Sequence, residues 1–193
     1  MTQREEKAAP AVICACDPDT VSPAFAIFSG GKLSYWNALG GRRLKVDRQK
    51  AEGKIINPMG SLLSEVKVLI DQWQPDLLVI ENQYLPPSAD AARRFRSLSR
   101  LISARAMITA VFILAGIRHE LVEPFSWQRS LGGSRLGRDE LKRLSMLKAS
   151  DIARQEIQDH NLADAINLGF WWIKTHPILK AKDSCCVFPA LRR

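Results

Sequence analysis

Short apolar runs alternate with longer amphipathic stretches along the chain, and this alternation predicts a β-sheet packed against helices. The second and third runs flank a Gly-Gly-Lys turn signal, so the first three runs are expected to form consecutive antiparallel strands. Strands are predicted at residues 11–16, 23–29, 33–39, 77–80 and 120–122. Helices are predicted at residues 61–73, 89–115, 126–131, 138–158 and 161–175, the third of them capped by Ser126.

The fourth apolar run, residues 77–80, has no polar break and contains β-branched side chains. This pattern is typical of a strand that is buried on both faces of a sheet. The run stops at Glu81, and Pro86 and Pro87 prevent the strand from continuing. Open α/β sheets place their ligand sites at the carboxyl ends of such strands. Glu81 is therefore a candidate site residue.

The order of the elements predicts the fold class. Three consecutive strands followed by alternating helices and strands favour an α/β protein with a mixed five-stranded sheet, antiparallel at first and then parallel, with helices on both faces. This is the ribonuclease-H-like arrangement. A length of 193 residues is typical of one domain. We expect a flexible polar leader at 1–10, the folded domain at 11–175 and a basic tail at 176–193.

Composition excludes some classes of protein. No apolar run approaches the ~20 residues that a membrane-spanning helix needs. Cys14, Cys16, Cys185 and Cys186 have neither the spacing of a zinc site nor that of a disulfide framework. A reducing, intracellular location, the cytoplasm, is therefore expected.

Positive charge is concentrated in one part of the chain. The net charge is +8, and the stretch from residue 93 to 148 contains twelve basic and four acidic residues. Such a concentration favours a polyanion partner, with nucleic acid as the first candidate. For any single arginine a solvated helix face is the better explanation, but for the clustered set we favour the polyanion. The candidate DNA contacts are Arg93, Arg94, Arg96, Arg100, Arg135, Arg138, Lys142 and Arg143.

Three acids occupy suggestive positions: Asp17 ends the first predicted strand, Glu81 ends the fourth, and Asp164 lies in the first turn of the last helix. Each has an ordinary explanation: Asp17 suits a turn, Glu81 suits the point where the core meets water, and Asn161 with Asp164 suits the N-cap and first-turn acid of a helix. The predicted topology, however, brings both strand ends and the start of the last helix to one edge of the sheet. Carboxylates gathered there repel one another unless cations lie between them. Oxygen ligands select Mg²⁺ or Mn²⁺, and two such ions can promote hydrolysis of a phosphodiester.

Four segments also resemble a known family. They read AVICACDPD, LLVIENQYLPP, LVEPFSWQRSLGG and HNLADAINLGFWW, and they resemble the corresponding segments of RuvC-type Holliday junction resolvases. The likeness runs in the right order over residues 11–175. It implies a homodimeric, Mg²⁺-dependent endonuclease that nicks two symmetric strands of a four-way DNA junction, with two ions per site. The short chain favours a phage or prophage member.

The resemblance also assigns residues. It implies that Asp17, Glu81 and Asp164 are catalytic metal ligands. The fourth carboxylate of the family lies three residues before the last one, where this chain has Asn161. Asn161 can ligate a metal without adding charge, and His160 can serve instead as ligand or base. Asp159 is a third possibility, so the fourth ligand stays open.

Two alternatives to a junction resolvase remain. A protein of the same fold with a degenerate site would bind branched DNA with little turnover, which the loss of charge at Asn161 permits. A nuclease with the same chemistry would instead prefer forks and flaps. An actin-like phosphotransferase is excluded, because 193 residues leave no room for its second domain.

Overall fold

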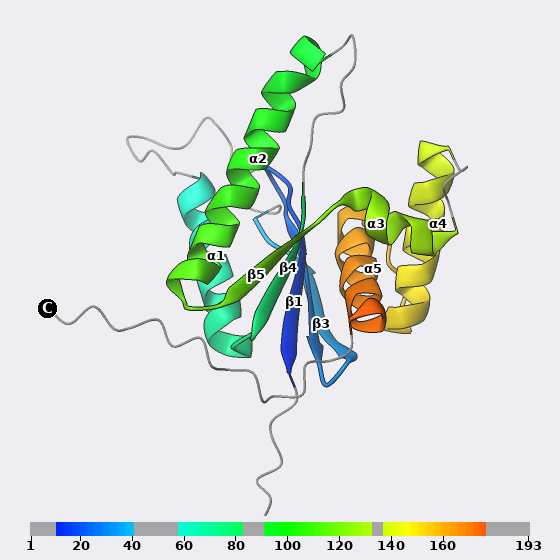
Figure 1. Cartoon of the computed structure of the whole chain (residues 1–193), viewed down its shortest axis with the longest axis horizontal. Helices are drawn as coiled ribbons and strands as arrows, with labels where there is room; N and C mark the ends of the chain where they lie inside the picture. Colours follow the sequence, from blue (N-terminus) through cyan, green and yellow to red (C-terminus); the bar gives the residue numbers. More distant parts are fainter. Residues whose placement is uncertain (1–10, 41–57, 83–90, 133–136, 177–193) are drawn as a thin grey trace, which may run out of the picture.

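A five-stranded sheet with helices on both faces forms the protein (Figure 1). The computed structural model describes residues 11–40, 58–82, 91–132 and 137–176. The strands are β1 (Val12–Asp17), β2 (Ala24–Ser29), β3 (Lys32–Ala38), β4 (Leu77–Glu81) and β5 (Arg118–Val122). The helices are α1 (Pro58–Trp73), α2 (Ala91–Leu114), α3 (Pro124–Gln128), the 3₁₀ turn η1 (Arg129–Leu131), α4 (Arg138–Ala153) and α5 (His160–Thr175).

The sheet has the strand order β3-β2-β1-β4-β5. β1 pairs antiparallel with β2, which pairs antiparallel with β3, whereas β4 lies parallel to both of its neighbours, β1 and β5. Gly30 and Gly31 form the predicted hairpin turn, and both have the positive φ angles that such a turn requires. The predicted mixed sheet is confirmed.

Successive residues of the central strands point to opposite faces, and each face has its own hydrophobic core. One face packs against α1 and α2 and includes Cys14 and Cys16 of β1. The other packs against α3, α4 and α5 and includes Ile13 and Ala15 of the same strand. Figure 1 shows α1 and α2 on one side of the sheet and the other three helices on the opposite side. Residues 77–80 are buried on both faces, as predicted.

Gly169 allows α5 to lie directly on the sheet. A Cβ atom at this position would lie 2.3 Å from Cε2 of Phe28 and 2.9 Å from Cβ of Ala15. Both neighbours are fully buried core residues of β2 and β1, so neither can move aside freely. The close approach matters because α5 carries Asp164, whose distance from β1 depends on it.

Several predicted helix boundaries are wrong; α1, for example, begins at Pro58 rather than at residue 61. The helix expected to run to residue 158 ends at Ala153, because Arg154 adopts a left-handed conformation with φ 52° and the chain then turns back along α4. Ile157, in this returning segment, donates its N–H to Ser150 Oγ at 2.9 Å. The short helix expected to begin after Ser126 begins at Pro124, since proline is well suited to the first helical position.

The leader at 1–10, the segment 41–57 and the tail beyond His176 lie outside the described residues. The domain boundaries expected there stay predictions. Within the described part of the chain, no helix has the length and apolar character needed to span a bilayer.

We predict that Gly169→Ala lowers the free energy of unfolding by about 1–3 kcal/mol, the usual range for overpacking a core. The added methyl group would meet the Phe28 ring and Ala15. Urea denaturation followed by circular dichroism measures the change. Gly137→Ala is the control for steric contact, because a Cβ atom there would meet nothing within 4 Å, and only the weaker preference of alanine for the N-cap of α4 should lower its stability. Equal stability of both variants would contradict the close packing of α5.

Candidate active site

Asp17 and Glu81 leave the sheet side by side. β1 and β4 are parallel with Cys16 opposite Ile80, so the next residue of each strand is a carboxylate at the same edge. Asp17 is 9% exposed and Glu81 is half-buried. The predicted convergence of these two strand ends is therefore present in the structure.

Asp164 lies one turn into α5, on the face that packs against the sheet and α4. The helix is capped by Asp159, whose Oδ1 accepts hydrogen bonds from the N–H groups of Asn161 (2.9 Å) and Leu162 (3.1 Å). The interpretation of Asn161 as the N-cap was wrong, because the helix begins at His160, one residue earlier than predicted, and Asp159 is its cap. Asp159 and Asn161 can both accept such bonds, so the sequence alone did not distinguish them. His160 is exposed and Asn161 is half-buried at this helix start.

The three acids share one electrostatic environment. Burial raises the pKa of Asp17 well above its usual range, and the charges of Glu81 and then Asp164 raise it further. Burial also raises the pKa of Asp164, an effect opposed by a hydrogen bond from Ser145 and by the charges of His160 and Lys142. Glu81 and Asp164 therefore both lie within interaction range of Asp17, although the three acids come from three separate elements.

A buried polar pair between α4 and α5 holds Asp164. Ser145 Oγ donates to Asp164 Oδ1 at 2.5 Å and accepts from Asn167 Nδ2 at 2.9 Å. The Asn167 amide also donates to the carbonyl oxygen of Ser145 at 2.8 Å. Because the amide occupies the acceptor side of the hydroxyl, the hydroxyl proton is directed at the carboxylate. Ser145 and Asn167 are 1% and 4% exposed, so water does not compete for these bonds.

Glu81 is held by Trp127, which the sequence did not identify as a site residue. The indole Nε1 donates to Glu81 Oε2 at 2.9 Å, and the ring is almost fully buried. Pro124 starts α3 directly after β5, which directs Trp127 back toward β4. An indole N–H is a neutral donor, so it orients the carboxylate without cancelling its charge.

A polar bridge next to Glu81 links α2 to the sheet. Arg105 donates a hydrogen bond to Asn82 Oδ1, and Asn82 Nδ2 donates to Glu123 Oε1 at 2.5 Å. The Asn82 N–H also donates to the Val122 carbonyl oxygen at 2.8 Å. The ends of β4 and β5 are thereby tied to each other and to the long helix that follows.

The predicted DNA-contacting residues fall into three groups. Lys142 is half-buried in α4 and close enough to lower the pKa of Asp164. Arg138 and Arg143 are exposed on the same helix, and Arg100 is exposed on α2. Of Arg93, Arg94 and Arg96 the structure describes only their helical backbone, and Arg135 lies outside the described residues. The contacts with DNA stay predictions.

The donor chemistry of Asp17, Glu81 and Asp164 fits a hard divalent cation, because carboxylate oxygens are the ligands that Mg²⁺ and Mn²⁺ prefer. Burial and then the charges of Glu81 and Asp164 raise the pKa of Asp17, and a bound cation would relieve the part that comes from charge repulsion. Yet among the described residues no three His, Cys, Asp or Glu side chains are arranged to hold a metal ion as they stand. Metal binding at this edge stays a prediction.

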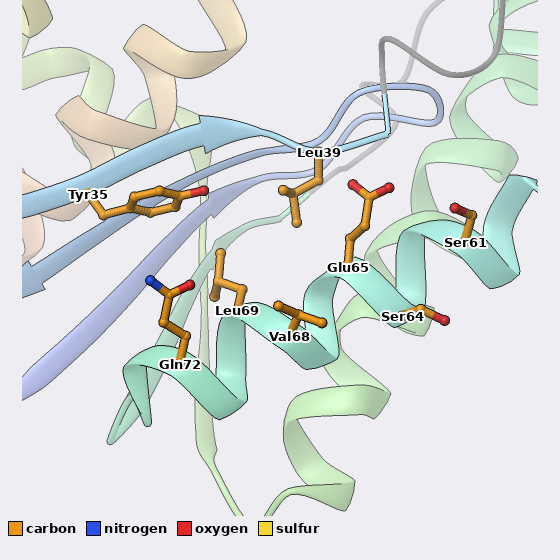
Figure 2. Close-up of a pocket in the computed structure, with 8 residues that line it drawn as sticks. All are labelled: Tyr35, Leu39, Ser61, Ser64, Glu65, Val68, Leu69 and Gln72. Carbon is orange, nitrogen blue, oxygen red and sulfur yellow. The ribbon is translucent and has the colours of Figure 1, made fainter.

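A separate cavity of about 310 Å³ lies between β3 and α1 (Figure 2). Leu39, Val68 and Leu69 contribute to its wall, and Glu65 reaches from α1 to accept a hydrogen bond from the Gly40 N–H at 3.1 Å. None of the three candidate acids lines it. This cavity is therefore not the candidate active site.

The architecture and the strand-end acids define a ribonuclease-H-like fold. Among solved structures, it is similar to that of Thermus thermophilus RuvC bound to a Holliday junction, with a TM-score of 0.61, 13% identity, and coverage of 86% of this chain and 96% of that one.

Two other solved structures share the fold. The yeast mitochondrial Holliday junction resolvase Ydc2 has a TM-score of 0.52 and 13% identity, with 88% of this chain and 82% of that chain covered. Fowlpox virus resolvase has a TM-score of 0.50 and 15% identity, with coverage of 85% and 97%. No protein-family model matches the sequence, and no curated protein does. The fold expected from the RuvC-like segments is confirmed.

We predict that Asp17→Asn raises the melting temperature of the metal-free protein near pH 7.5. The raised pKa means that the native state binds this proton more tightly than the unfolded state, so native stability falls as pH rises above the ordinary carboxyl pKa of ~4. Asparagine removes that dependence. Thermal melts of both proteins in EDTA across pH measure it, and the two melting temperatures should converge toward pH ~4. A difference that grows as the pH falls would contradict the raised pKa.

Proposed function

We propose that the protein is a metal-dependent endonuclease that cleaves branched DNA, with four-way junctions as the first candidate substrate. The observation that carries the proposal is the buried Asp17 with Glu81 and Asp164 in its electrostatic environment, at one sheet edge of a strongly basic chain. A buried acid with two acidic neighbours lowers the stability of the folded protein, and such a cost is often retained because the acid has a function. Sites of this kind are therefore candidates for function.

In this proposal Asp17, Glu81 and Asp164 hold Mg²⁺ or Mn²⁺, with Asn161, His160 or Asp159 as a further ligand. The ions, when bound, supply a hydroxide nucleophile and stabilise the leaving oxygen of the phosphodiester. His160 is exposed beside Asp164 and serves as a ligand or base. Because Asp159 already caps α5 through two hydrogen bonds, we favour His160 or Asn161 as the additional site residue.

In this proposal, basic residues near the three acids bind the phosphates of the DNA substrate. Lys142 lies near Asp164, with Arg138 and Arg143 on the same helix, so phosphates approaching the acids meet cations of α4. The structural similarity to resolvases bound to Holliday junctions supports a four-way DNA junction as the substrate. Forks and flaps, with the same phosphodiester chemistry, are the second candidate.

We also propose that the protein is a homodimer joined through α2. The outer face of this helix is apolar or small: Phe95 is 62% exposed, Ile102 36% and Ile113 52%, and Ala106 and Ala110 lie between them. Positions 95, 102, 106 and 113 fall on one line of a helix, so a second copy can cover them with the same face.

The decisive test of activity is cleavage of a synthetic four-way junction by the wild type and by Asp17→Asn, Glu81→Gln and Asp164→Asn. Each substitution removes a ligand charge and keeps the basic surface, so cleavage should be lost while junction binding persists. Mg²⁺ should support the wild-type reaction and EDTA should stop it. Linear duplex and a fork are the comparison substrates. Normal cleavage by two of the three variants would place the site elsewhere.

Trp127→Phe should impair the site while keeping an aromatic ring in the core. Loss of the indole N–H frees Glu81 to adopt other orientations, and loss of such supporting hydrogen bonds commonly lowers metal affinity or activity ~10–100-fold. The Mg²⁺ concentration for half-maximal cleavage should rise. Trp172→Phe is the matched control, because Trp172 Nε1 donates to Glu120 Oε2 at 3.0 Å rather than to any of the three acids. Equal effects of the two variants would show that Trp127 acts only through stability.

The dimer is tested by sedimentation velocity of the wild type and Ile102→Glu. A charge at the centre of the apolar face should dissociate the dimer, because the carboxylate would be buried without a partner. Val68→Glu serves as the control, since Val68 is 63% exposed on α1 rather than α2. A monomeric wild type, or dissociation by both substitutions, would contradict the α2 interface.

A further inference from the structure

A groove of about 980 Å³ lies at the end of the sheet opposite the three acids. Its walls are the β2–β3 turn and the facing parts of α4 and α5. The register of β1 and β2 pairs Asp17 with Ala24 and Val12 with Ser29, so the turn is one strand length from Asp17. At ~3.3 Å per residue that length is about 17 Å. The turn end of the groove is therefore away from the three acids, whereas Asn167, whose amide supports Ser145 and through it Asp164, lines the wall of the groove.

The groove is strongly basic. Four of its lining residues are cations and one is an acid: Lys32, Lys148, Arg154 and Lys174, against Asp151. Lys148 Nζ donates to the carbonyl oxygen of Ser130 at 3.0 Å, which fixes its ammonium group at the wall. An excess of cations in a concave surface raises the positive electrostatic potential inside it, and this potential attracts a polyanion.

Arg154 occupies a position where glycine is usual. It ends α4 in the left-handed region, with φ 52°, which side chains with a Cβ atom rarely adopt. A glycine would form the same turn without strain. Gln74 ends α1 in the same region, so the conformation alone assigns no role, but at Arg154 it places a cation on the wall of the groove.

Aromatic rings lie among these cations. Trp171 lines the groove and is half-buried, and Phe170, also in the lining, is 37% exposed. Lys174 Nζ lies 5.4 Å from the centre of the Phe170 ring. Rings beside cations are the combination that binds single strands, because unpaired bases stack on the rings while the cations contact the phosphates.

We propose that this groove binds a single-stranded segment of the DNA substrate. The inference rests on the proposed function and, within it, favours the second candidate substrate, because a four-way junction of paired arms offers no free strand to the groove. A fork or flap with a single-stranded arm can occupy the three acids at its branch point and the groove with its arm. Such substrates should then bind more tightly than a fully paired junction.

The test measures DNA binding rather than cleavage. All proteins carry Asp17→Asn and EDTA is present, so that the substrates stay intact. Fluorescence anisotropy compares a fork with a single-stranded arm, the same fork with that arm paired, and a four-way junction. Adding Lys32→Ala with Lys174→Ala should weaken binding of the single-stranded arm and spare the paired substrates. Each lost phosphate contact lowers the slope of log affinity against log salt by ~0.7, so the pair should lower it by about 1.4.

The variant Arg154→Gly distinguishes an effect of the lost charge on binding from an effect of lost stability. It removes the cation and relieves the left-handed strain, so the melting temperature should stay the same or rise while binding of the single-stranded arm weakens. Lys67→Ala with Arg118→Ala is the control for net charge, because both residues are exposed outside the groove.

The proposal is overturned if the groove variants bind the single-stranded arm as tightly as their parent, or if the control pair weakens it equally. A groove that instead takes an acidic peptide would give the first of these results. Failure of the proposed function is distinguishable, because a wild-type protein that cleaves no branched DNA leaves these binding differences unaffected.

Discussion

The meeting of three acids at one sheet edge, one of them buried and two half-buried, is the constraint on which the rest of the site depends. β1 and β4 are parallel and in register, so Asp17 and Glu81 must emerge together. Gly169 then brings α5 close enough to add Asp164. Neutral donors orient two of these acids, Trp127 at Glu81 and Ser145 at Asp164, and neither neutralises its partner. The arrangement keeps negative charge concentrated where a divalent cation would relieve it.

The two faces of the sheet contribute differently to this edge. The face with α3, α4 and α5 supplies the third acid, its supporting hydrogen bonds and the nearby Lys142. The face with α1 and α2 presents the apolar outer surface of α2 and, through Arg105 and Asn82, ties that helix to the strand ends. In a dimer formed through α2, the interface helix would therefore be hydrogen-bonded, through Arg105, to Asn82, the residue that follows Glu81.

The sequence was sufficient for features that depend on local pattern. An unbroken apolar run predicted β4, and an acid at its end predicted the place of Glu81. Contacts between distant side chains leave no such pattern, which is why Trp127, Asn167 and Arg105 were not identified. The cap of α5 was misassigned because Asp159 and Asn161 are both good acceptors, and the left-handed Arg154 was missed because the turn occurs without glycine. The sequence predicted that the three acids meet at one edge, which the structure confirms for the ends of β1 and β4, whereas their role as metal ligands stays a prediction.

The central claim is that Asp17, Glu81 and Asp164 bind divalent cations at this edge. The most direct measurement is anomalous diffraction at the manganese edge from crystals grown with Mn²⁺. The account predicts anomalous peaks between the ends of β1 and β4 and the start of α5, within ligand distance of these carboxylates. No peak there at saturating Mn²⁺, with ordered side chains for all three residues, would contradict it.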